Sequence, residues 1–273
     1  MCRFKIYIDS YGSYLVYEEV IADFQKKYSH NEKKGIIQLF YQMIIPVLNY
    51  YSCTRSNYMN EVDDNGNEIH GEYDNSKVKI IFFGQGNKII FKEKIKTKKL
   101  DIVCDGNNIY IEIGKSCIIN GHIRISSDCK LIIGDNLLSQ FSNGYYIGEG
   151  CSMTIGNDCM FSGGITFRTD DSHAIYDVIT GNRINKGKDI IIGNHVWVCE
   201  NCKILKNTTI RDGSIIGMNT LISNCTIMNN SVVAGCPFKY IRYNIAWEKP
   251  YVNSHKFSQN VIKSYYWKKT EFE

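Results

Sequence analysis

The sequence lacks the segments that would place the chain in a membrane or a secretory pathway. Its longest apolar stretch, residues 36–51, is too short to cross a bilayer and is broken by Gln38, Gln42 and Pro46, so a buried helix is expected there. Residues 1–10 have no basic start followed by an apolar run and a small-residue cleavage site, which predicts no signal peptide. A formal net charge of +4 does not by itself imply nucleic acid. We therefore expect a cytoplasmic protein without a transmembrane segment or a nucleic-acid partner.

Paired metal or disulfide motifs are also scarce, although the chain has 11 cysteines. Cys199 and Cys202 form one C-x-x-C pair, but no second pair follows, so we expect neither a metal site nor a redox motif. A chain of 273 residues is not a small domain that depends on disulfides. We predict free thiols in a reducing cytosol. Several fall in or beside the repeats described next, where a small apolar residue packs well: Cys117, Cys129, Cys159, Cys202 and Cys225.

What the sequence has instead is a six-residue repeat over residues 189–234. Aliphatic residues occupy every sixth position without a slip: Ile192, Val198, Ile204, Ile210, Ile216 and Ile222. Helices repeat near 3.6 residues and strands at 2, so neither explains a period of six. The pattern is typical of a solenoid whose coils of about eighteen residues each contain three short strands. We predict an all-β fold, a left-handed parallel β-helix of hexapeptide repeats.

A looser repeat extends this domain toward the N-terminus. From Val78 onward, turn residues and aliphatic runs recur at spacings of roughly 20 to 22 residues, which indicates early coils with widened corners. We therefore assign residues 77–247 to the β-helix. Residues 1–76 are expected to form a small, mainly helical region that ends in a polar linker over residues 61–75. Residues 248–273 form an aromatic and basic tail, and the sequence does not decide whether it packs on the protein or touches substrate.

Four lysines of one parity, Lys92, Lys94, Lys96 and Lys98, would project from one face of an extended strand. Such a stripe could attract an anionic polymer. The alternative is a solvated edge that prevents strands of different molecules from pairing.

A polar loop over residues 168–188 interrupts the repeat. Ile155 and Ile192 are 37 residues apart, where one coil would take about eighteen. Long loops on a rigid scaffold often carry function. This loop contains His173, preceded by Asp170 and Asp171. Histidine is the natural general base near neutral pH, and a neighbouring carboxylate can fix its tautomer.

The motifs of the loop and of its surroundings resemble a known family. The stretch DDSHAIYDVITGNRINKGKDIIIGNHVWV and the later GCPFKYIRYNIAW are similar to the hexapeptide-repeat acetyltransferases, in particular to the polysaccharide and polysialic acid O-acetyltransferases. The resemblance covers about residues 105–247. It implies an acetyl-CoA-dependent enzyme that acetylates a hydroxyl of a surface glycan, such as a capsular polysaccharide, a sialic-acid-containing glycan or an O-antigen.

The resemblance also implies roles for particular residues. His173 would be the catalytic base of a direct transfer without an acyl-enzyme, and Trp197 would line the site. Asn143 and Asp171 would contact the acceptor. The contacts to acetyl-CoA would come from Gly217, Met218, Ser223 and Asn224, with Lys239 and Arg242 reaching its phosphates. The family forms its sites between the subunits of a trimer, so a homotrimer is expected. The sequence departs from the family at Cys199, Cys236 and Phe238, which puts local contacts in doubt.

Two other functions remain open. The same solenoid could N-acetylate an amino sugar or a sugar nucleotide, although the loop looks more like the O-transfer branch. A non-catalytic scaffold or a γ-class carbonic anhydrase would be a different class. The anhydrase needs three histidines on zinc, two of them closely spaced, and His122, His173 and His195 do not provide such a pair.

Overall fold

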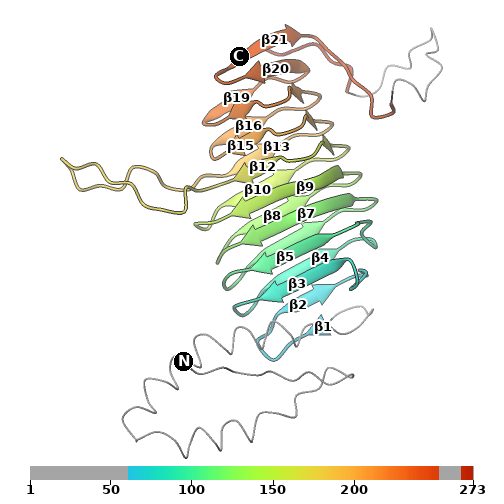
Figure 1. Cartoon of the computed structure of the whole chain (residues 1–273), viewed down its shortest axis with the longest axis vertical. Coiled ribbons are helices and arrows are strands. Elements are labelled where there is room, and N and C mark those ends of the chain that lie inside the picture. Colours follow the sequence, from blue (N-terminus) through green and yellow to red (C-terminus); the bar gives the residue numbers. More distant parts are fainter. Residues whose placement is uncertain (1–60, 252–265, 273) are drawn as a thin grey trace, which may run out of the picture. The chain divides into compact units, whose positions relative to one another are not determined.

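Short strands stacked in coils form the described part of the chain, which comprises residues 61–251 and 266–272 of this computed structural model (Figure 1). Strands of successive coils pair in parallel, so the fold is a parallel β-helix, and the predicted solenoid is confirmed. The residues at the six-residue positions are all buried, as the repeat predicted: Ile192, Val198, Ile204, Ile210, Ile216 and Ile222. The helices expected within residues 1–60 lie outside the described residues. Within the ranges that the structure describes, no helix is long and apolar enough to cross a membrane.

Eight parallel strands form one side of the β-helix, which we call face 1. The N-terminal coils (residues 68–168) advance by 20 to 22 residues, as in the pairs of Ile69 with Ile89 and of Ile89 with Ile111. The C-terminal coils (residues 189–235) advance by 18 or 17, so the predicted change in spacing is confirmed. The strands of face 1 are β2 (Glu68–His70), β4 (Lys88–Phe91), β6 (Tyr110–Ile113), β8 (Lys130–Ile133), β10 (Ser152–Ile155), β13 (Ile190–Ile192), β16 (Thr208–Ile210) and β19 (Cys225–Ile227), and β1 (Glu61–Val62) pairs antiparallel with β2.

The other two sides, face 2 and face 3, belong to one sheet that bends around a corner. Two long strands, β7 (Ile118–Ile125) and β9 (Leu138–Ile147), contribute to both faces. Face 2 continues through β11 (Met160–Phe161), β14 (Trp197–Val198), β17 (Ile215–Ile216) and β20 (Ser231–Gly235), and β21 (Phe238–Tyr243) pairs antiparallel with β20. Face 3 contains β3 (Val78–Phe82), β5 (Leu100–Cys104), β12 (Thr166–Arg168), β15 (Lys203–Leu205) and β18 (Leu221–Ile222).

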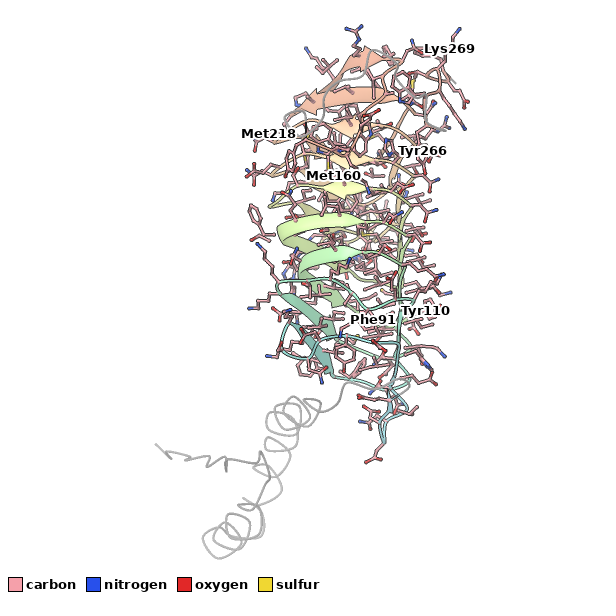
Figure 2. All side chains as sticks on the ribbon, turned by 90° about the vertical axis from the view of Figure 1, so that its right-hand side faces the viewer. Phe91, Tyr110, Met160, Met218, Tyr266 and Lys269 are labelled. Carbon is pink, nitrogen blue, oxygen red and sulfur yellow. The ribbon has the colours of Figure 1, made fainter. Side chains whose placement is uncertain are left out.

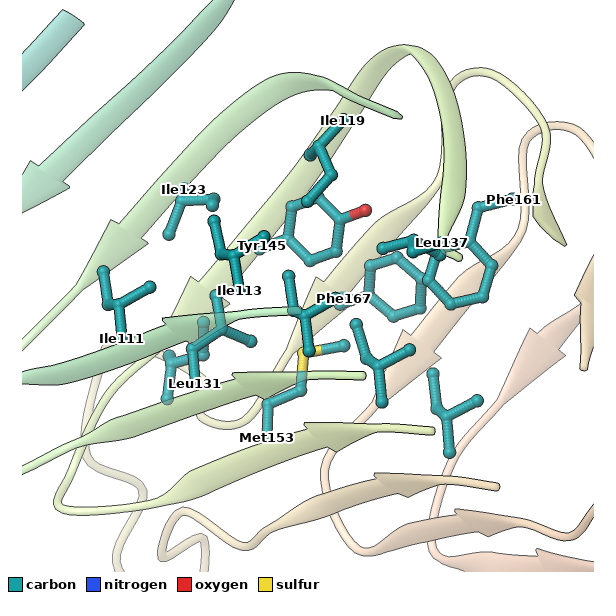
Figure 3. Packing of buried hydrophobic residues seen from close by; sticks show 14 of the residues in the cluster. Ile111, Ile113, Ile119, Ile123, Leu131, Leu137, Tyr145, Met153, Phe161 and Phe167 are labelled. Atoms are coloured by element: carbon teal, nitrogen blue, oxygen red, sulfur yellow. The ribbon is translucent and has the colours of Figure 1, made fainter. Parts of the chain in front are cut away.

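Aromatic rings fill the core of the N-terminal coils where the coils are widest (Figure 3). The ring of Phe167 stacks on Tyr145 at 5.0 Å between centroids and lies 5.1 Å from Phe161. All three side chains are fully buried, and the Tyr145 hydroxyl shares a 2.7 Å hydrogen bond with the Ser139 hydroxyl. The buried Tyr145 hydroxyl therefore has the partner that burial of a polar group requires.

A ladder of polar side chains holds the corner that follows face 1. Asp135 accepts from the amide of Lys115, Asn157 from that of Asp135, and Asn194 from that of Asn157, at 2.7–2.8 Å. Asp212 continues the ladder by accepting from the amide of Asn194 at 2.7 Å. Backbone groups that leave the strand pairing at this corner are satisfied by the coil above, which explains why Asn or Asp follows the strand in these coils.

Two expectations from the sequence are corrected by the strands. Residues 61–75 are not only a linker, because they contain β1 and β2, and β2 pairs in parallel with β4. The β-helix thus begins before residue 77. The four lysines do not share one face of a strand, because the chain between Phe91 and Leu100 turns across the coil. Lys92 pairs with Glu112, whereas Lys96 forms a bridge to Ile118 on face 2.

The described part of the C-terminal tail packs on the side of the stack, and we call it the C-terminal strap (residues 244–251 and 266–272). The His195 ring lies between Trp247 and Tyr266, with centroids at 4.0 and 4.4 Å and nearly parallel planes. The Tyr266 hydroxyl donates to Asp158 at 2.9 Å, and Figure 2 shows Tyr266 against the flank of the coils. The three stacked rings therefore attach both segments of the strap to the corner between faces 1 and 2.

Candidate active site

The polar loop leaves the β-helix as a narrow arm (residues 169–188) at the corner between face 3 and face 1 (Figure 1). Met153 pairs with Ile190, so the coil is continuous on either side of this 37-residue step. An antiparallel bridge joins Tyr176 to Arg183 within the arm. At the tip, Asp177 accepts from the amides of Ile179 and Thr180, which lowers the pKa of its carboxyl group. The arm is a hairpin closed by a capped turn.

Polar contacts fix the base of the arm to the coils. The Asn185 amide nitrogen donates to the Asp171 carboxylate at 2.9 Å and to the His173 carbonyl at 2.8 Å. Lys206, one coil further along, forms an ion pair with Asp171 and donates to the Asn185 carbonyl at 3.1 Å. The Lys206 ammonium group is the main reason that the pKa of Asp171 is lowered. A second ion pair joins Arg183 to Glu149. These contacts orient the backbone that carries His173.

The His173 side chain is exposed near the base of the arm. Its amide donates to the Asp171 carbonyl at 2.7 Å, which is a backbone contact. The two carboxylates have other partners, because Asp171 binds Lys206 and Asn185, and Asp170 accepts from the Ser172 amide at 2.7 Å. Among the described residues, no carboxylate is hydrogen-bonded to the His173 ring. The chain by itself therefore leaves the ring open to a ligand or to another molecule.

Trp197 lies on a different side of the β-helix, in β14 on face 2. Its indole nitrogen is buried and has no hydrogen-bond partner within the described ranges, and its ring is 5.7 Å from that of Trp247. Face 2 is opposite the corner from which the arm leaves, since the three faces follow one another around each coil. One chain therefore does not bring the predicted base and the predicted tryptophan to the same side.

The side chain of Asn143 is buried and holds the corner between faces 2 and 3. Its amide nitrogen donates to Ser139 at 2.9 Å and to the Ser162 carbonyl at 2.8 Å, and its oxygen accepts from the Ile165 amide at 2.9 Å. These bonds commit both ends of the amide to the coil. The structure thus gives Asn143 a structural role at this corner, and its contact with the acceptor stays a prediction. A hydrogen-bonded corner asparagine and a ligand-binding asparagine cannot be told apart from sequence spacing.

The residues expected to bind acetyl-CoA lie in the last two coils. Gly217 and exposed Met218 are at the corner that precedes β18, and exposed Ser223 and Asn224 are at the corner that follows it. Lys239 and Arg242 are exposed on β21. The first four flank one strand of face 3, so an extended ligand could reach both corners.

Cys199 and Cys202 are free thiols, as expected. Burial raises the pKa of Cys199 to about 12, so this thiol is neutral near pH 7 and poorly suited to metal binding. In the described part of the chain, no group of three His, Cys, Asp or Glu residues could hold a metal ion. The two other histidines of the repeats are separated, with His122 on face 3 and His195 within the strap stack.

A cavity of about 760 Å³ in the N-terminal coils was not expected from the sequence. It opens at the corner between faces 2 and 3, and its lining includes Lys98, His122, Phe141 and Tyr146. A weak signal was present, because His122, Gly144 and Thr166, which line the cavity, follow one another at 22-residue steps. That spacing can be recognised as a shared surface only when the strand register is known.

The fold and the histidine-bearing arm define a hexapeptide-repeat acyltransferase. No family model matches the chain. A polysialic acid O-acetyltransferase from Neisseria meningitidis is 33% identical over 185 residues, which cover 67% of this chain and 85% of that protein. A second polysialic acid O-acetyltransferase, from Escherichia coli, is 35% identical over 141 residues, or 51% of this chain and 45% of that protein.

Solved structures agree with these sequence matches. The crystal structure of a polysialic-acid-specific acetyltransferase superposes with a TM-score of 0.60 at 31% identity, covering 68% of this chain and 88% of that one. That of a second polysialic acid O-acetyltransferase gives a TM-score of 0.58 at 33% identity, covering 64% and 82%. The chain therefore belongs to the hexapeptide-repeat acetyltransferase family and is a homologue of the polysialic acid O-acetyltransferases.

Proposed function

We propose that this protein transfers the acetyl group of acetyl-CoA to a hydroxyl of a surface polysaccharide. The observation that supports this most is the arm with exposed His173, which leaves the β-helix between the cavity-bearing N-terminal coils and the regular C-terminal coils. Two relatives named as polysialic acid O-acetyltransferases are 33% and 35% identical to this chain over 185 and 141 residues. An acidic surface polysaccharide is therefore the acceptor class that we favour.

In the proposed reaction His173 acts as the general base. Its neutral ring removes the proton from the acceptor hydroxyl while that oxygen attacks the thioester carbonyl carbon of acetyl-CoA. The new C–O bond gives a tetrahedral oxyanion, and its collapse breaks the C–S bond. The coenzyme A thiolate takes the proton from the imidazolium, which restores the base. No acyl-enzyme forms in this route.

We propose that Gly217, Met218, Ser223 and Asn224 contact the pantetheine arm of acetyl-CoA. Their two corners flank β18, and an extended chain fits along the regular left-handed coils that we expect. Lys239 and Arg242 would bind the phosphates, since both are exposed cations on the last strand. Trp197 would line the transfer site, where a ligand or a neighbouring chain could satisfy its indole N–H.

We further propose that the active unit is a homotrimer. Outward-facing apolar residues stack in register along face 2: Ile118, Leu138, Met160, Trp197, Ile215 and Val232. At the tip of the arm, Val178 and Ile179 are 97% and 91% exposed, which is costly for an isolated chain in water. Packing against other copies would cover both surfaces. It would also bring His173 of one chain to face 2 of its neighbour.

The test is thiol release from acetyl-CoA with a panel of acidic and neutral oligosaccharides. We expect acetylation of an acidic glycan by the wild type and a loss of about 10²–10⁴-fold in kcat/KM for His173→Ala, the usual range for a general base. Lys186→Ala on the same arm is the control and should keep its activity. An unchanged rate in His173→Ala would contradict the mechanism, and acetylation of amines alone would show an N-acetyltransferase.

A further inference from the structure

The cavity in the N-terminal coils borders a column of outward-facing residues along face 3, and we call the cavity and this column together the face-3 groove. A glycine lies in its wall, because Gly144 has no side chain where its register partners His122 and Thr166 project outward. A Cβ atom on Gly144 would lie 2.6 Å from the Tyr146 ring, so that ring rests across the glycine. The groove is thus formed by the sequence at these positions and not by a chance gap between loops.

The aromatic side chains His122, Phe141 and Tyr146 line the cavity of this face-3 groove, and Arg168 covers the Tyr146 ring from outside the cavity. The Arg168 guanidinium carbon lies 4.9 Å above the centroid of the Tyr146 ring, and the His122 ring lies 6.0 Å from that ring. Phe141 borders the cavity at the corner with 63% of its side chain exposed. Sugar rings stack their C–H faces on such exposed aromatic rings, while amides and hydroxyls beside them bind sugar hydroxyls. The cavity supplies Gln140 for the second task.

Lysine side chains also border the same groove. Strand pairing aligns Asp101, His122, Gly144, Thr166 and Lys203 in one column, one residue per coil. Lys203 donates to the Thr166 hydroxyl at 3.0 Å, so it stands at the edge of the cavity that Thr166 lines.

Two lysines of the groove have positive charges that no carboxylate of the described residues neutralises. Lys98 and Lys203 have no carboxylate partner among the described residues, whereas Lys99 lies 3.7 Å from Asp101. Each end of the groove therefore has a lysine without a carboxylate partner. Such lysines attract an anionic ligand that spans the distance between them.

The groove is long enough for several sugar residues. Adjacent strands lie about 4.8 Å apart, so the four coil steps from the level of Lys98 to that of Lys203 span roughly 19 Å. Lys203 belongs to the same coil as Trp197. One end of the groove thus lies at the level of the proposed transfer site, and the other lies several coils away.

We infer that the face-3 groove binds an acidic segment of the polysaccharide several sugar residues from the hydroxyl that is acetylated. Lys98 and Lys203 pair with carboxylates of the glycan, and Phe141 stacks on one of its rings. This inference rests on the proposed function, because it names a second contact region for the same acceptor. Binding in the groove makes the enzyme prefer long acidic chains to short ones.

The test is equilibrium binding of fluorescently labelled polysialic acid to the full chain without acetyl-CoA, followed by anisotropy. The Lys98→Ala/Lys203→Ala double variant is expected to bind about tenfold more weakly, since each lysine contributes a charge-assisted contact. Phe141→Ala is expected to bind about threefold more weakly through loss of a stacking surface. The matched controls Lys130→Ala on face 1 and Phe83→Ala, equally solvent-facing residues outside the groove, should bind as the wild type does.

Several outcomes would overturn the inference. These are wild-type affinity in the double variant, equal affinity for neutral dextran, or no binding of polysialic acid by the wild type. The assay also separates this inference from the proposed function. Polymer binding that depends on Lys98 and Lys203 without any acetyl transfer would support the groove and contradict the enzyme. Transfer to polysialic acid with the same KM in the double variant would contradict the groove alone.

Discussion

The N-terminal and C-terminal coils have the same three-sided plan but use their residues differently. The N-terminal coils take 20 to 22 residues per step, and the C-terminal coils take 18 or 17. The additional residues lie on face 3 and at its corner with face 1, since Gly144 and Met153 are nine residues apart whereas their register partners Lys203 and Thr208 are five apart. The C-terminal coils contain only aliphatic residues at the repeat positions. Under the proposed function, the wide coils hold the acceptor and the regular coils hold the extended cofactor, with the arm between them.

The largest effect on stability is expected from the aromatic core of the wide coils. Phe167→Ala should lower the free energy of unfolding by about 3–5 kcal/mol, because it removes a ring packed between Tyr145 and Phe161. In the C-terminal coils, Ile216→Val removes a single buried methylene group and should cost about 0.5–1.5 kcal/mol. Urea unfolding followed by circular dichroism measures both. Equal losses would contradict the view that the aromatic core sets the width of these coils.

A glycine at the corner of a wide coil should be the next most sensitive position. Gly121 has a φ of 137°, and a Cβ atom there would lie 2.0 Å from the carbonyl oxygen of Asn143. Gly121→Ala should cost at least about 1–3 kcal/mol through backbone strain, because the neighbouring backbone must also move. Gly150→Ala has a positive φ but open space around it, and should cost about 1 kcal/mol. Thermal unfolding compares the two variants, and a tolerated Gly121→Ala would mean that the corner can relax.

Lys206 allows a test of the base of the arm, which lies between the N-terminal and the C-terminal coils. Lys206→Ala removes the cation that holds Asp171 and the Asn185 carbonyl, and kcat/KM should fall by about tenfold through loss of orientation. Lys206 is a positioning residue, so Lys206→Arg should restore part of the activity while the unfolding midpoint stays constant in all variants. Lys186→Ala serves as the exposed control. Loss of stability together with activity would instead indicate a purely structural role.

The smallest expected effect is a pH dependence of the strap. Burial lowers the pKa of His195 below the usual 6.5, so the unfolded chain binds a proton more readily than the folded chain does. The stability that this adds is present above about pH 6.5 and is lost as the pH falls through the lower folded value. Urea titrations at pH 7 and pH 5 should show the decline. His195→Asn, which keeps a residue suited to the positive φ of 53°, should show less of it, and an equal decline would contradict the assignment.

Much of the fold could be predicted, because the coils of a β-helix repeat their buried positions at a nearly fixed number of residues. Ile192 and its successors repeat without a slip, and each is buried. The start of the domain was less visible, since β1 and β2 lie within a polar stretch that resembles a linker. The lysine stripe was misjudged because parity indicates a shared face only where the chain is a strand, and residues 92–99 turn.

The candidate site could be predicted only in part. His173 stands out because it lies in the long step between coils, and that step is visible as a gap in the repeat. The groove could not be found in this way, because His122, Gly144 and Thr166 are about one coil apart in sequence and meet only through strand register. The role of Asn143 depends on its hydrogen bonds, which a spacing rule does not specify.

The most direct measurement is complementation between two inactive variants. His173→Ala and Trp197→Ala are each expected to lose acetyl transfer when expressed alone. If the proposed homotrimer forms, co-expression of the two variants gives mixed trimers in which some sites have an intact His173 from one chain and an intact Trp197 from its neighbour. We predict that thiol release from acetyl-CoA with an acidic polysaccharide then recovers to a measurable fraction of the wild-type rate. Failure of purified mixed trimers to recover any activity would contradict a site shared between arm and coil of different chains.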